Sequence, residues 1–148
     1  RCGWRPAGRR RATVIWHAVA GGLELACWAD LRVAESDAVL GVFCRRVGVP
    51  LIDGGTVRLP RIVGLGRALD LILTGRAVSA QEALEMGLVN RVVPTGQALS
   101  AAVELAHQIA AFPPAAMTAD RASVYAGLDL PAADGLAAEF SGGLAAVS

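Results

Sequence analysis

Hydrophobic residues recur along this chain in short runs with the spacing of strands and helices. Four apolar runs of strand length bounded by turn residues are predicted strands: Thr13–Ala20, Leu31–Ala34, Ala38–Val42 and Leu88–Val93. The glycine pair Gly21–Gly22 ends the first run, which we expect to be buried, and Pro94 closes the last. The chain is therefore rich in short strands only in its first two thirds.

Amphipathic spacing predicts helices in the remaining segments. These are Gly22 to about Ala29, Gly54–Ile62, Leu65–Leu73, the residues behind Ser79, Leu99–Ala111, and the segments after Pro114 and Pro131. Pro60 is expected to end or kink its helix, since proline lacks an N–H. Gly75 is a stop signal. The sequence S-A-Q-E from Ser79 to Glu82 is a capping box, which predicts a helix that starts there and ends at Gly87.

Strands alternate with helices before the chain becomes purely helical. This order predicts an α/β fold with helices packed over a sheet. Three parts are expected. Residues 1–12 show neither helical nor strand periodicity, residues 13–111 form an α/β core, and residues 112–148 form a C-terminal helical region. No internal repeat or low-complexity linker interrupts them.

Composition and charge exclude several classes of function. The formal net charge is +1, which argues against nucleic acid as a partner. Although 54% of the 148 residues are hydrophobic, every uncharged stretch is short or broken, so no membrane span is predicted. Cys2, Cys27 and Cys44 lack metal-ligand spacing, which predicts no metal site and a reduced, cytoplasmic protein.

The candidate chemistry lies around two glycine pairs, each accompanied by an acid. Gly21 and Gly22 open a helix whose first N–H groups can bind developing negative charge, and Glu24 follows within the first turn. Asp53 precedes the second pair. Each has a simpler interpretation: a strand-to-helix turn for the glycines, a dipole-stabilised helix acid for Glu24, and an N-cap for Asp53.

Three segments of the chain resemble the crotonase (enoyl-CoA hydratase/isomerase) superfamily. Residues 20–41 read A-G-G-L-E-L-A-C-W-A-D-L-R-V-A-E-S-D-A-V-L-G, residues 47–63 read V-G-V-P-L-I-D-G-G-T-V-R-L-P-R-I-V, and residues 73–94 read L-T-G-R-A-V-S-A-Q-E-A-L-E-M-G-L-V-N-R-V-V-P. The resemblance implies a partial spiral of ββα units followed by C-terminal helices that drive trimer formation. Since the family pattern is missing before about residue 13 and stops early at the other end, we expect a fragment.

The resemblance also implies an activity and a set of roles. The substrate would be an acyl-CoA thioester, in fatty-acid β-oxidation for example, with no cofactor beyond the CoA of the substrate, in a homotrimer or hexamer. Gly21 would supply one N–H of an oxyanion hole whose other N–H comes from an upstream segment, Gly22 would lie at the substrate, and Glu24 would be the first catalytic glutamate. The alternative is a non-catalytic remnant, or an oligomerisation partner of a full-length homologue.

Two positions leave the reaction open. The second glutamate of hydratases falls twenty residues after the first, where this chain has Cys44. That cysteine is expected either at the substrate or as a small buried structural residue. Asp53 matches a loop that carries a base or nucleophile in some superfamily members, and the cap and catalytic alternatives are evenly balanced. His17 is expected to be a buried strand histidine and His107 a structural helix residue.

Overall fold

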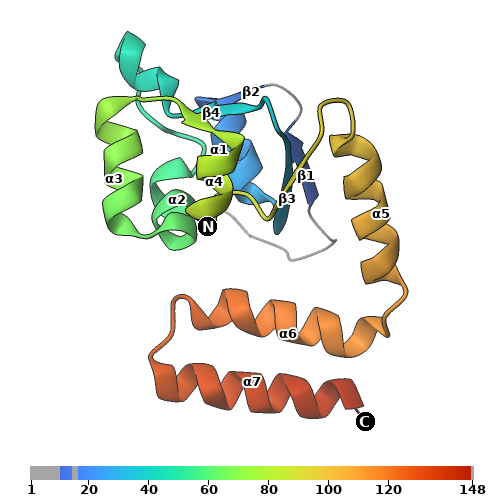
Figure 1. Ribbon diagram of the computed structural model, residues 1–148. Helices are drawn as coiled ribbons and strands as arrows, with labels where there is room; N and C mark the ends of the chain where they lie inside the picture. The colour runs from blue at the N-terminus through green and yellow to red at the C-terminus, as the bar shows by residue number, and fades with distance from the viewer. Residues whose placement is uncertain (1–10, 15–16, 148) are drawn as a thin grey trace. The chain divides into compact units, whose positions relative to one another are not determined.

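The computed structural model describes residues 11–14 and 17–147 (Figure 1). Among these, residues 11–104 belong to one compact unit and 105–147 to a second. The first unit contains all six strands of the described chain. Their bounds are Arg11–Val14 (β1), His17–Val19 (β2), Leu31–Glu35 (β3), Val39–Gly41 (β4), Val78–Ser79 (β5) and Arg91–Val93 (β6).

The strands form two three-stranded sheets, β1-β3-β6 and β2-β4-β5. β1 pairs parallel to β3, with Thr13 opposite Val33, and β2 pairs parallel to β4, with Ala18 opposite Leu40. The first strand of the β1-β2 pair thus lies beside the first strand of the β3-β4 pair, and the second beside the second, so that the chain advances by one turn of a spiral. This is a spiral of ββα units, and the predicted α/β fold is confirmed.

Helices follow each strand pair. In the first unit they are Gly21–Trp28 (α1), the 3₁₀ helix Phe43–Val47 (η1), Gly55–Val63 (α2), Leu65–Thr74 (α3) and Ala80–Glu85 (α4), and Ala98–Ala110 (α5) begins there. The predicted helix start at Ser79 is confirmed, because the Ser79 hydroxyl accepts the Glu82 N–H at 3.2 Å. The Glu82 carboxylate accepts from Arg76 Nη2 at 2.7 Å, so only the Ser79 half of the capping box forms, and the helix ends at Glu85. Gly75 ends α3 in the left-handed conformation, with φ 61°, as its stop signal predicts.

Three predicted elements differ from the structure. The single strand expected at Thr13–Ala20 is two strands, β1 and β2, which belong to different sheets. Pro60 lies inside α2 and does not end it, because the helix runs on to Val63 and the Pro60 carbonyl accepts the Gly64 N–H at 3.0 Å. The strand expected at Leu88–Val93 begins only at Arg91. The N–H groups of Leu88 and Val89 are instead bound to the Ala83 carbonyl, at 2.8 and 3.1 Å, and so close the end of α4.

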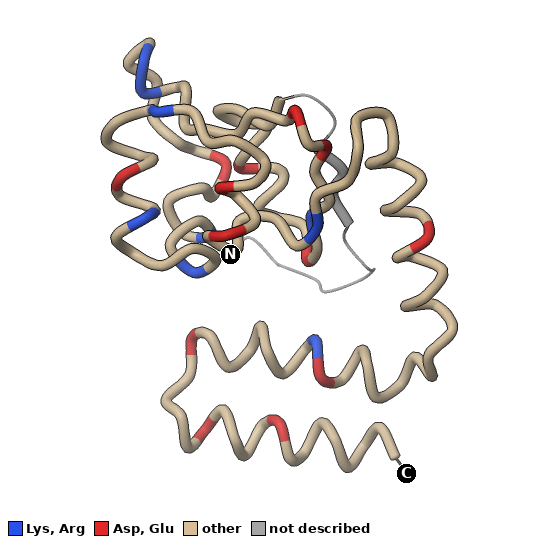
Figure 2. Tube along the Cα trace, in the orientation of Figure 1, with Lys and Arg blue, Asp and Glu red and all other residues tan. Residues whose placement is uncertain are grey.

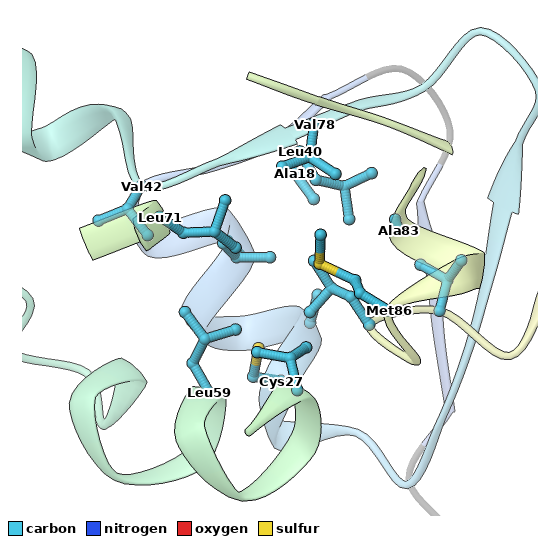
Figure 3. Close-up of a cluster of buried hydrophobic side chains, with 14 of the residues drawn as sticks. Ala18, Cys27, Leu40, Val42, Leu59, Leu71, Val78, Ala83 and Met86 are labelled. Atoms are coloured by element: carbon cyan, nitrogen blue, oxygen red, sulfur yellow. The ribbon is translucent and has the colours of Figure 1, made fainter. Parts of the chain in front are cut away.

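The core of the first unit lies between the β2-β4-β5 sheet and helices α1 to α4. Leu40, Leu59, Leu71 and Val78 are completely or almost completely buried, and Figure 3 shows them around Met86 and Cys27. The prediction that His17 is buried is wrong. Its side chain is exposed at the start of β2, whereas its neighbour Ala18 points into the core, as alternation along a strand requires.

The second unit contains the last two helices, α6 (Pro114–Gly127) and α7 (Ala132–Val147), which pack against each other (Figure 1). Neither helix buries a residue, and charged residues are sparse along both (Figure 2). The predicted helices after Pro114 and Pro131 are confirmed. Within the described residues, no helix combines the length and apolar character that crossing a membrane requires.

Candidate active site

The turn between β2 and α1 sets the geometry of the site. Ala20 has φ 50° and ψ −126°, and it is the one non-glycine residue with positive φ among those the structure describes. Its N–H donates to the Gly41 carbonyl at 3.0 Å, and its own carbonyl accepts from Leu23 and Glu24 at 3.0 and 3.2 Å. These bonds hold a strained backbone that turns a strand directly into a helix.

Gly21 and Gly22 form the first two residues of that helix, and both are exposed. First-turn N–H groups have no acceptor within their own helix, and the helix dipole makes this end attractive to negative charge. Neither glycine has a positive φ, so the sharp turn is made by Ala20 and not by the pair. The predicted oxyanion donor Gly21 therefore lies where an N–H is available to a ligand.

Glu24 is the buried acid of this site, with 4% of its surface exposed. Its Oε1 accepts two backbone N–H groups from the loop before α2, that of Asp53 at 3.0 Å and that of Gly55 at 2.7 Å. Both bonds end on the same oxygen. Oε2 therefore has no hydrogen bond within the described part of the chain, and it is the oxygen available to accept or deliver a proton.

Asp53 lies on the exposed side of the same loop, beside the helix N-terminus. Its Oδ2 would be 3.4 Å from a Cβ added at Gly21. The residue that caps α2 is Gly54, in the left-handed conformation and without a side-chain cap bond, so the N-cap interpretation of Asp53 is wrong. The Arg58 guanidinium donates to the Asp53 carbonyl at 2.7 Å and fixes this loop. The structure thus brings Gly21, Glu24 and Asp53 together.

Cys44 is buried within η1 and belongs to the hydrophobic core cluster. The two arginines that follow it form their hydrogen bonds with backbone carbonyls at the end of α3, not with Cys44. Arg45 Nε donates to the Ile72 carbonyl at 3.2 Å, while Arg46 Nε donates to the Gly75 carbonyl at 2.8 Å and stacks on the Phe43 ring at 3.6 Å. This burial agrees with the structural interpretation of Cys44, and its place at the substrate stays a prediction.

Three features of the site were not found from the sequence. Ala20 carries no residue-type signal for positive φ, and nothing in the sequence distinguishes the role of Gly55 from that of its neighbour Gly54. Cys27 lies on α1 one turn after Glu24, and burial raises the pKa of its thiol to about 11. No group of acidic, histidine or cysteine side chains among the described residues is placed to hold a metal ion.

The fold and the site together define a class of protein. It is an α/β protein built of ββα units, in which a buried carboxylate lies one helical turn after an exposed helix N-terminus. A family model for enoyl-CoA hydratase/isomerase matches residues 12–141. The chain therefore belongs to the enoyl-CoA hydratase/isomerase family, and the expected crotonase superfamily membership is confirmed.

Relatives and solved structures agree with this assignment. Enoyl-CoA hydratase EchA19 of Mycobacterium tuberculosis is 44% identical over 108 residues, which are 73% of this chain and 41% of that protein. Short-chain-enoyl-CoA hydratase of Clostridium acetobutylicum is 38% identical over 117 residues, or 79% of this chain and 45% of that protein. The chain thus spans less than half the length of these two relatives.

Two solved structures superimpose closely. The crystal structure of an enoyl-CoA hydratase subunit from Geobacillus kaustophilus matches with a TM-score of 0.85 and 37% identity, covering 89% of this chain and 51% of that one. A structure from Thermobifida fusca, assigned as an enoyl-CoA hydratase and solved in complex with acetoacetyl-CoA, matches with a TM-score of 0.86 and 31% identity, covering 93% of this chain and 54% of that one. The ββα spiral is therefore the fold of this chain's solved relatives.

Proposed function

We propose that the protein acts on acyl-CoA thioesters by stabilising an enolate, with Glu24 as general acid and base. The observation that carries this proposal is the placement of the buried Glu24 behind an exposed helix N-terminus, with one carboxylate oxygen that no described residue hydrogen-bonds. The acetoacetyl-CoA bound by the Thermobifida fusca relative supports a CoA thioester as the class of substrate. The CoA portion belongs to the substrate, and the chemistry needs no other cofactor.

In this reaction the thioester carbonyl oxygen gains negative charge as the enolate forms. The Gly21 N–H donates to that oxygen, a contribution typically worth ~3 kcal/mol of barrier per donor. In hydration, the oxygen of water bonds to Cβ and the enolate takes a proton at Cα. In isomerisation, a base removes one proton from Cα and the dienolate receives a proton at Cγ. Glu24 Oε2 performs proton transfer in either case.

Asp53 favours isomerisation as the second candidate reaction. Its carboxylate lies beside Gly21, and it is not used as a cap. Glu24 and Asp53 then form a pair of acids able to remove and return a proton. The hydratase pair, by contrast, is incomplete, because Cys44 occupies the position of the second glutamate.

We further propose that the reaction belongs to fatty-acid breakdown and that the protein forms a trimer or hexamer.

Substitution of Glu24 by glutamine tests this function. Glu24→Gln keeps the size of the side chain and removes its acid–base group, so turnover of crotonyl-CoA and of a 3-enoyl-CoA should fall by about two orders of magnitude. Glu85→Gln, at an exposed glutamate of α4, is the matched control and should leave turnover unchanged. Turnover by Glu24→Gln within a few-fold of wild type would show that another group transfers the proton.

A further inference from the structure

Gly55 lies in direct contact with the Glu24 side chain. A Cβ added at Gly55 would be 2.8 Å from both Cγ and Oε1 of Glu24, and 3.1 Å from its Cδ. Real Cβ atoms essentially never make contacts under 3.0 Å. Because both residues are buried, the carboxylate occupies the space that any side chain at position 55 would need.

The backbone at position 55 does not itself require glycine. Gly54 has φ 92°, a conformation that favours glycine, whereas Gly55 is absent from the positive-φ residues and starts the regular helix α2. Gly54 supplies the left-handed backbone conformation that the turn at the D-G-G sequence needs. The reason for the second glycine must therefore be space, and the neighbour that fills this space is Glu24.

We propose that Gly55 is a positioning residue for Glu24. Its N–H anchors Oε1 at 2.7 Å, and its missing side chain lets the carboxylate reach that anchor. At the other end of the residue, the Glu24 N–H is bound to the Ala20 carbonyl at 3.2 Å. Glu24 is thus fixed at its backbone and at one oxygen, which determines where Oε2 points.

The effect of Gly55 on turnover rests on the proposed function, and it is tested with Gly55→Ala. The added methyl group displaces the carboxylate from its anchor, and a misplacement of about 1 Å can cost about a hundred-fold in rate. We expect kcat to fall by this amount while KM changes little. Gly66→Ala is the matched control, because Gly66 is also near the start of a helix, has no positive φ and has no atom within 4 Å of an added Cβ.

An unchanged kcat for Gly55→Ala in the wild-type background would overturn the proposal.

The contact itself is tested by stability, without any assay of turnover. Gly55→Ala should lower the thermal midpoint of the wild-type protein but not that of Glu24→Ala, which lacks Cγ and Oε1. Equal destabilisation in the two backgrounds would overturn the proposal, because the methyl group would then be clashing with something other than Glu24. If the coupling is present but the wild type turns over no acyl-CoA, the proposed function fails and the steric assignment of Gly55 stands.

Discussion

At the scale of single residues, the two acids of the site have opposite surroundings. Glu24 is buried and anchored by two N–H groups on one oxygen, whereas Asp53 is exposed and contributes its N–H to that anchor while its carboxylate lies beside Gly21. One residue therefore both positions the first acid and presents a second. Under the proposed function, Glu24 would transfer a proton from its buried position and Asp53 from the exposed side of the site.

Cys44 carries a prediction about reaction preference. Restoring a carboxylate with Cys44→Glu should raise hydration of crotonyl-CoA relative to isomerisation of a 3-enoyl-CoA, because orienting water and delivering a proton is shared by two acids in hydratases. The ratio of the two rates is the measurement. Cys44→Gln controls for the larger side chain and should bring no gain. A wild type that already hydrates as fast as ordinary hydratases would contradict the idea that Cys44 limits hydration.

At the scale of elements, the buried residues of helix α1 include both the candidate acid Glu24 and residues of the hydrophobic core. Leu23, Glu24, Ala26 and Cys27 are all buried, and the helix packs against α2, which starts at the Glu24 anchor. The acid is therefore held by the same helix–helix contact that forms the core. A change in the packing of α1 is expected to change the position of Glu24 as well.

Alkaline pH should weaken this packing through Cys27. Burial raises the pKa of its thiol from 9.0 to about 11, an effect that nearby Arg32 and Arg58 only partly oppose. Between pH 9 and 11 the unfolded chain loses the thiol proton while the folded chain keeps it. Stability should therefore fall as pH rises through this window, by up to about 1.4 kcal/mol per pH unit.

Urea unfolding at a series of pH values measures this contribution. The chain has no lysine, one tyrosine and two other cysteines, so comparison with a variant that lacks only the Cys27 thiol isolates its contribution. Cys27→Ala should be less stable at pH 8, because it leaves a cavity, but should lose less stability than wild type between pH 9 and 11. Parallel pH profiles for the two proteins would show that the Cys27 thiol is not held protonated by folding.

At the scale of the whole molecule, local signals predicted the elements and the family pattern predicted the candidate site. The Ser79 N-cap, the Gly75 stop, Pro114 at the start of α6 and Pro131 before α7 act within a few residues, so they can be recognised in the sequence. The sequence could not decide whether Asp53 caps α2, because an N-cap and a site acid share the same D-G-G sequence. The folded loop shows that Gly54 is the cap.

Pairing across the spiral also lay beyond local pattern. Thr13 lies opposite Val33 and Ala18 opposite Leu40, and nothing in an apolar run specifies which later strand it joins. The exposure of His17 has the same origin, since alternation in a three-residue strand depends on register. The sequence pattern was most informative where an element depends on its own residues.

Exchange of α-protons with solvent tests the central claim most directly. An enolate formed from a saturated acyl-CoA such as butyryl-CoA can only return to the thioester by taking a proton, which in D₂O is a deuteron at Cα. NMR or mass spectrometry should detect this deuterium with the wild-type protein, at a rate at least about a hundred-fold above that of Glu24→Gln. Turnover of an enoyl-CoA without any α-exchange, or equal exchange by the two proteins, would contradict enolate chemistry at Glu24.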